Sequence, residues 1–172
     1  MKSTKLLGAL GAALDARFND AARPPLGGVT GAVEFRPGLN VPALDNWGTC
    51  SMLWVTAGRR WRSRTFPVSA EEQRCEGGTI LEVTVGVARC SNALGDMGDP
   101  PSVEQMAQEM DIQEDDKDRL EAAVCSALND LRRDLHVTDW ARGPVDTIGP
   151  EGGTVAVFIT LTAAMAPSGL SG

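Results

Sequence analysis

The chain has one histidine, no tyrosine and only 5% aromatic residues among its 172 positions. It also lacks the short motifs that hold phosphates, dinucleotides or catalytic zinc, and it has no G-x-S-x-G nucleophile turn. A metal centre or a Ser-His-Asp machine needs several His, Cys or acidic side chains to converge, and one histidine offers little material for that. The sequence therefore predicts a protein that is not an enzyme and binds no cofactor and no metal.

An excess of positive charge is missing as well. Sixteen Lys and Arg stand against 23 Asp and Glu, which gives a net charge of -7, so general nucleic-acid binding through a basic face is not expected. No run approaches the roughly 20 apolar residues of a membrane span. The N-terminal segment 1–18 is too short and too interrupted by glycine for a secretory signal. We expect a protein made in the cytoplasm, without a membrane partner.

The four cysteines, Cys50, Cys75, Cys90 and Cys125, are isolated singles with no C-x-x-C pair. Their spacing gives little support for a zinc site. Because a lone cysteine behaves as a small hydrophobic residue, buried free thiols are the expectation. The alternative is that two of the cysteines form a disulfide, if the assembled particle leaves the cell.

What the chain does have is strong hydrophobic periodicity. An apolar stripe at helical spacing predicts an N-terminal helix over residues 3–18. Alternating apolar residues predict strands at 32–35, 50–57, 79–90 and 154–163, with 137–148 as the hairpin partner of the last. In the strand 79–90, the side chains from Leu81 to Val87 at every second position should face the core. Glu82 and Thr84 should then face water or a neighbouring subunit.

A long helix is predicted over residues 102–135. Ser102 and Gln105 fit a capping box at its start. Its apolar stripe consists of Met106, Met110, Leu120, Val124, Leu128, Leu131 and Leu135. The polar gap at 113–118 leaves three alternatives open: a kink, a break between two helices, or an exposed face.

The order of these elements predicts an α+β domain. An antiparallel or mixed sheet would be packed by one long helix and an N-terminal helix. We expect a single domain over residues 1–163 and a flexible C-terminal tail over 164–172.

Two charged clusters are the candidate functional residues. The basic one, GRRWRSR, contains Arg59, Arg60, Trp61, Arg62 and Arg64. In a strand, Arg60, Arg62 and Arg64 would share one face, while Arg59 and Trp61 would share the other. Phosphate binding is one interpretation. A subunit contact is favoured, because Arg and Trp are enriched among the residues that dominate protein interfaces.

The acidic cluster spans residues 111–118. It lacks the glycine of a calcium-binding loop, so a solvated helix face or an intersubunit acidic patch is expected. Asp115 and Asp116 are the candidates for pairing with the basic cluster of a neighbour, head to tail, in a ring of identical subunits. The single histidine, His136, could be a general base or a metal ligand, but a cation at a helix C-terminus is favoured.

Several segments together resemble a known group of proteins. These are the strand GTILEVTVGVARC, the loop NALGDMGDPPS, the helix QEDDKDRLEAAVCSAL and the strand after GPEGG, preceded by CSMLWV and Phe66-Pro67. Over about residues 48–163 the chain resembles small virion proteins of long-tailed phages (siphoviruses) of actinobacteria, encoded among head-to-tail connector and tail genes. The element order is most similar to the tail terminators.

The resemblance implies a structural protein of the virion tail and neck. Tail terminators form a probably hexameric ring that caps the tail tube and joins it to the head. The implied partners are other copies of the chain, the major tail tube protein, the head-to-tail stopper or connector, and viral DNA that passes through the lumen without sequence-specific binding. The family has no catalytic motif to carry over.

Three other interpretations compete. A neck adaptor would be mostly helical, which the strands at 79–90 and 154–163 disfavour. A head-to-tail stopper would tend towards a β-barrel, which the long helix disfavours. A small cytoplasmic metal-binding protein or enzyme is the remote alternative.

Overall fold

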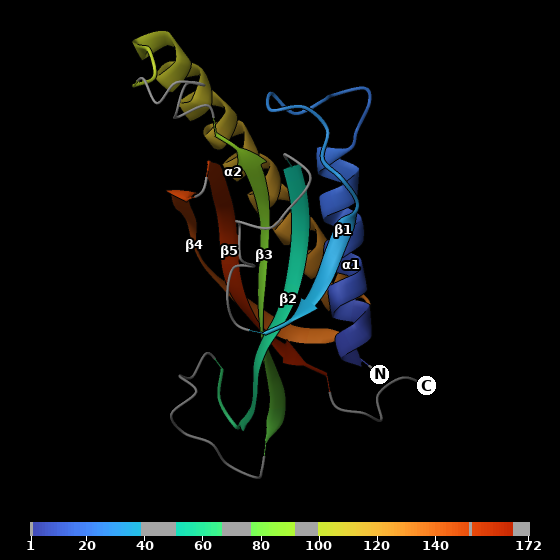
Figure 1. The fold of residues 1–172 in the computed structure, drawn as a ribbon. Helices are drawn as coiled ribbons and strands as arrows, with labels where there is room; N and C mark the ends of the chain where they lie inside the picture. Colours follow the sequence, from blue (N-terminus) through green and yellow to red (C-terminus); the bar gives the residue numbers. More distant parts are fainter. Residues whose placement is uncertain (1, 39–50, 67–76, 92–99, 152, 167–172) are drawn as a thin grey trace.

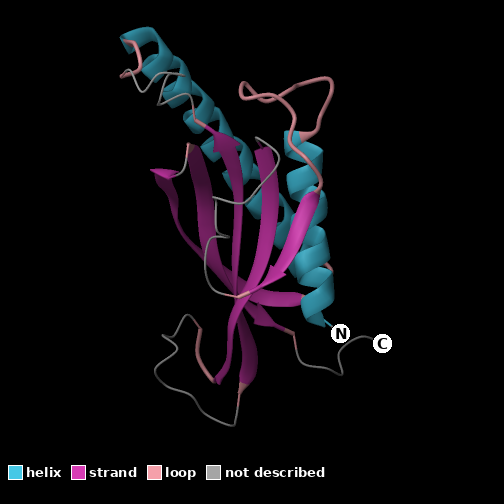
Figure 2. Ribbon diagram, viewed as in Figure 1, coloured by secondary structure: helices cyan, strands magenta, loops and turns pink. Residues whose placement is uncertain are grey.

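A computed structural model describes residues 2–38, 51–66, 77–91, 100–151 and 153–166. The elements in chain order are α1 (Lys2–Phe18), β1 (Val33–Pro37), β2 (Ser51–Ser63), β3 (Gly78–Cys90), α2 (Val103–Arg133), β4 (Val137–Glu151) and β5 (Thr154–Met165). A five-stranded mixed sheet carries both helices on one face (Figure 1, Figure 2). The expected α+β class, with one long and one N-terminal helix, is confirmed. Among the described helices, none is both long and apolar enough to cross a membrane.

The strand order in the sheet is β1-β2-β3-β5-β4, and only the β1–β2 pair is parallel. The predicted hairpin is present, because β4 pairs antiparallel with β5. Strand β5 runs on to Met165, so Ala164 and Met165 belong to the sheet and not to the expected tail. Residues 167–172 lie outside the described part of the chain.

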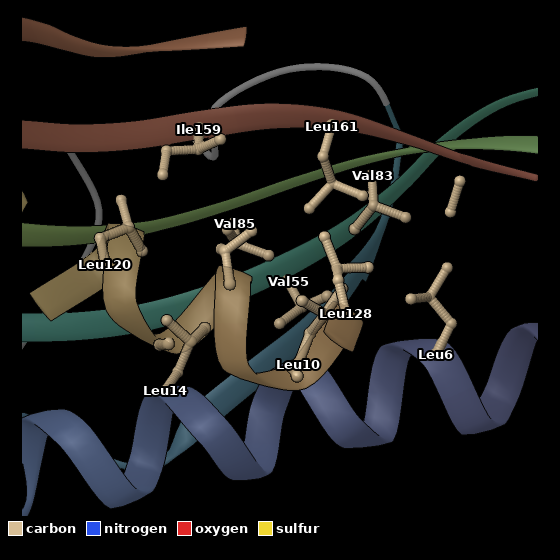
Figure 3. Packing of buried hydrophobic residues seen from close by; sticks show 14 of the residues in the cluster. Leu6, Leu10, Leu14, Val55, Val83, Val85, Leu120, Leu128, Ile159 and Leu161 are labelled. Atoms are coloured by element: carbon tan, nitrogen blue, oxygen red, sulfur yellow. The ribbon is translucent and has the colours of Figure 1, made fainter. Parts of the chain in front are cut away.

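The core lies between the sheet and the two helices. The α1 stripe is buried, and every second residue of β3 from Leu81 to Val87 faces the same layer, as predicted. Figure 3 shows how Leu10 and Leu14 of α1 and Leu128 of α2 converge on Val55 and Val85. The helical spacing and the strand alternation thus meet in one cluster, because each places its apolar side chains on one side of the element.

The other face of the sheet is buried too, which corrects the expectation for Thr84. This residue is 6% exposed, and its Oγ1 lies 3.0 Å from Oγ1 of Thr160 on the next strand. Trp54 is fully buried on this face and lies directly over Gly86, where an added Cβ would come within 2.3 Å of the indole. This face contains both polar and apolar side chains. The Thr84 hydroxyl is satisfied by Thr160, and the Trp54 indole covers Gly86, so both kinds of residue are buried there. Glu82, the other residue expected to face outwards, is half-buried.

Helix α2 is continuous, so the polar gap at 113–118 is neither a break nor a separate helix. The capping box of Ser102 and Gln105 is present in both directions. At the other end Leu135 has a left-handed φ of 56°, and His136 N donates to Leu131 O at 2.9 Å in a Schellman-type ending.

Candidate functional site

The predicted basic cluster lies at the end of a strand that is longer than expected. Strand β2 continues through Ser63, and its pairing with β3 shifts register between Ala57 and Arg60. Because a bulge changes which side chains point to each face, Trp61 pairs opposite Ile80 and is buried, at 7% exposure. Arg60, on the adjacent position, pairs opposite Leu81 and remains exposed.

We define the basic strip as Arg59, Arg60, Arg62 and Arg64, all of which are exposed. Arg59 lies in the bulge, with its Nε 3.8 Å from Glu82 Oε1. Arg59 is exposed, whereas Trp61, which is predicted to share its face of the strand, is buried. The strip lies at the lower end of the β2–β3 ribbon in Figure 1, opposite the N-terminal end of α2.

The expectation that Asp116 faces a neighbouring subunit is wrong. It is 2% exposed and forms a bidentate pair with Arg89 of β3, with Nε to Oδ2 at 2.6 Å and Nη2 to Oδ1 at 2.8 Å. The same guanidinium donates through Nη1 to the carbonyl oxygens of Gly27 and Gly28. Gly27 permits this approach, since a Cβ there would come within 2.6 Å of the arginine Nε.

Asp115 is also engaged within its own chain. Its Oδ2 accepts from Arg119 Nε at 2.8 Å and from the backbone N–H of Leu26 at 2.9 Å. Arg119 in turn donates to the carbonyl oxygens of Arg17, Arg23 and Pro24. Both carboxylates therefore fasten the loop after α1 to α2, and neither is left to pair with the basic strip of another subunit.

The buried pair has opposing effects on the pKa of Asp116. Burial raises this pKa above its usual value, and the hydrogen bonds and positive charge of Arg89 counteract part of that rise. The balance is upward, because removing a carboxylate from water costs more than one neighbouring guanidinium restores. Sequence reasoning missed Arg89, although a single arginine ending an otherwise apolar strand was a signal of a buried partner.

A pocket of about 220 Å³ lies beside this pair, between the first half of α2 and the adjacent strands β3 and β5. Its apolar lining comes from valines of the two strands and from Ile112 of α2. Gln105, Gln108 and Glu109 bring polar groups from the helix. The pocket is lined by the N-terminal part of α2 and by the strands beside it, and Figure 1 shows α2 diverging from the sheet towards this end of the helix.

We define the α2 arm as residues 103–111, the part of the helix that projects past the sheet and past α1 (Figure 1). Val103, Met106 and Met110 of the arm are 72%, 46% and 65% exposed. The two methionines, like Leu135 at 67% exposure, belong to the predicted apolar stripe but are not buried. The stripe itself is real, because Leu120, Val124, Leu128 and Leu131 farther along the helix are buried.

The remaining candidates do not converge on a reaction centre. His136 Nε2 lies 3.3 Å from Lys5 Nζ, and since an ammonium can only donate, that ring nitrogen accepts in this contact. The residues that the structure describes contain no group of three or more His, Cys, Asp or Glu that could hold a metal ion.

The cysteines differ from one another. Cys90 is disulfide-bonded, so the expectation of free thiols is wrong for it. Cys125 is free and half-buried. Cys50 and Cys75 lie outside the described part of the chain.

No protein-family model and no curated protein sequence matches this chain.

Proposed function

We propose that this protein is a structural subunit of a homo-oligomeric ring, the tail terminator of a long-tailed phage, which caps the tail tube and joins it to the head or neck. The element order supports this proposal, since an N-terminal helix, a sheet, a long helix and a final strand are what the resemblance implies. A ring of this kind needs contact surfaces and no chemistry.

The observation that carries the proposal is the basic strip. Its arginines project from a paired β-ribbon whose buried Trp61 fixes the backbone, so the charges are held on a stiff support. Rigid arginine-rich surfaces with little entropy to lose are effective protein contacts. The chain as a whole is acidic, with a net charge of -7, and a lumen of that sign would let DNA slide through without holding it.

The first test is the mass of the purified protein by light scattering, alone and with isolated tail tubes. A hexamer in solution, or a monomer that adds one ring at each tube end, is the expected result. A monomer that ignores tubes would contradict the proposal and favour a different connector of the neck.

A charge-reversal variant tests the strip itself. Arg60→Glu with Arg62→Glu is expected to abolish the ring while the monomer stays folded, because both side chains are exposed. The matched control is Arg132→Glu with Arg133→Glu, which makes the same charge change on exposed residues of α2. An intact ring in the strip variant, or a ring lost equally in the control, would contradict the strip as a subunit contact.

A further inference from the structure

The apolar stripe of α2 continues from the core into the α2 arm, where its side chains are exposed. Met106 and Met110 continue the stripe that Leu120, Val124 and Leu128 bury against α1 and the sheet, but on the arm, where Figure 1 shows α2 diverging from the sheet, the stripe is exposed. The pocket side of the arm is polar instead, with Gln105, Gln108 and Glu109. An apolar stripe continuous with the core and left exposed is typical of a surface that another molecule completes.

Charge identifies the kind of molecule. Residues 103–116 include six acidic side chains and no basic one. Asp115 and Asp116 are used inside the chain, but Glu104, Asp111 and Asp118 are exposed. These three recur every seven residues, so they form one row on the exposed side of the helix, about 120° around its axis from Met106 and Met110. The complementary surface has to be basic and able to cover methionine.

The basic strip of the same chain has these properties. Arg59 and Arg60 are exposed at the far end of the molecule from the arm. An arginine covers apolar surface with its aliphatic stem while its guanidinium meets a carboxylate. Two complementary surfaces at opposite ends of one chain make a heterologous contact, which repeats from copy to copy and closes into a ring when the rotation allows.

We infer that the exposed side of the α2 arm, from Met106 and Met110 round to the acidic row that Glu104 and Asp111 begin and that Asp118 continues beyond the arm, is the surface on which the basic strip of a second copy of this chain docks. The inference rests on the proposed ring and names its second contact surface, which replaces Asp115 and Asp116 as the acidic partner.

The test is a charge exchange across the contact. Asp111→Arg with Asp118→Arg is expected to raise the concentration needed for half-assembly about tenfold or more, because like charges then face each other. Combining this change with Arg60→Glu and Arg62→Glu in one chain is expected to restore the ring. Both positions on α2 are exposed and lie away from the helix N-terminus, and an unchanged urea midpoint verifies folding.

A second pair of variants tests the apolar part. Met106→Ser with Met110→Ser is expected to weaken assembly by a similar factor. The matched control, Leu26→Ser with Val29→Ser, removes exposed apolar side chains elsewhere (65% and 58% exposed) and is expected to leave assembly unchanged.

The outcomes separate the two proposals. A wild-type protein that never forms a ring, alone or on tubes, contradicts the proposed function and the inference together. A wild-type ring that survives Asp111→Arg with Asp118→Arg overturns the inference alone. A ring that each single reversal breaks and the combined exchange does not restore also overturns it, since the strip and the arm would then contact different surfaces.

Discussion

Arg89 and Asp116 form a buried ion pair. We expect Asp116→Ala to lower the free energy of unfolding far more than the replacement of both residues by apolar ones. Asp116→Ala leaves a guanidinium that is 8% exposed with only the carbonyl oxygens of Gly27 and Gly28 as acceptors. Arginine cannot shed its charge at accessible pH. Breaking a buried pair in this way costs about 3–5 kcal/mol, a large share of a total stability of about 5–15 kcal/mol.

The reverse change should be milder and dependent on pH. In Arg89→Met the isolated carboxyl can take up a proton, and burial already raises its pKa. The double variant Arg89→Met with Asp116→Leu should unfold within about 1 kcal/mol of the wild type, or be more stable, because a well-packed apolar pair of similar volume avoids the cost of burying two charges.

Urea unfolding followed by tryptophan fluorescence measures these differences. With an m-value of about 2 kcal/mol/M, a loss of 4 kcal/mol lowers the midpoint by about 2 M. A midpoint for Asp116→Ala within about 0.5 M of the wild type would refute the reasoning. So would a double variant whose loss equals the sum of the two single losses, since the pair would then have no coupling energy.

The direction of the pH dependence follows from the raised pKa of Asp116. A carboxyl whose pKa is higher in the folded state binds its proton first in that state, so its contribution to stability is full below the unfolded pKa and is lost as the pH rises through the folded value. The stability of the wild type relative to the double variant should therefore increase as the pH falls through the folded pKa of Asp116 towards about 4. A relative stability that decreases over this window would show that the pair is net stabilising in its ionised form.

Three further predictions concern the scaffold. Leu135→Gly should stabilise the protein by about 0.5–1 kcal/mol in thermal unfolding, because Leu135 has a left-handed φ of 56° and is largely exposed; a lower melting temperature would contradict this. Gly86→Ala should cost about 1–3 kcal/mol and alter the tryptophan emission, because the new Cβ would lie 2.3 Å from Trp54 Cζ2 and 2.7 Å from Val157 O; an unchanged spectrum and midpoint would refute this packing. Val85→Asp should prevent folding, since it buries an unpaired charge at a position with no exposure; a soluble variant with a cooperative urea transition would show that the facing of β3 is inverted.

The sequence was enough to predict which side of α1 and of β3 faces the core. Leu81 to Val87 alternate with smaller or polar residues, and the α1 stripe recurs at helical spacing, so both facings could be predicted. The capping box of α2 is equally local, because Ser102 and Gln105 satisfy each other's backbone within one turn. These predictions succeeded because the interactions concerned are close in sequence or strictly periodic.

The failures involve partners that are distant in sequence. Asp115 and Asp116 are neighbours in the chain, but each is held by a different arginine, and Arg89 comes from a strand 27 residues upstream. The bulge in β2 leaves no periodic signal, so the predicted strand ends at Ala57 although the pairing with β3 continues to Ser63. The alternation predicts that Thr84 faces water or a neighbouring subunit, because it indicates two different faces; it does not indicate that the second face, with Trp54 and the Thr84–Thr160 hydroxyl contact, is also buried.

The buried pair and the exposed arm are also connected through the helix that bears both. Asp116 ties α2 to the end of β3 just before the arm leaves the sheet, whereas Leu120, Val124 and Leu128 fix the next turns in the core. A continuous helix is stiff over so short a distance, so the packed turns should be enough to direct the arm. We therefore expect the double variant Arg89→Met with Asp116→Leu to form the same oligomer as the wild type. A double variant that is as stable as the wild type but fails to assemble would show instead that the ion pair positions the arm. The pair would then be needed for assembly and not for the stability of the fold.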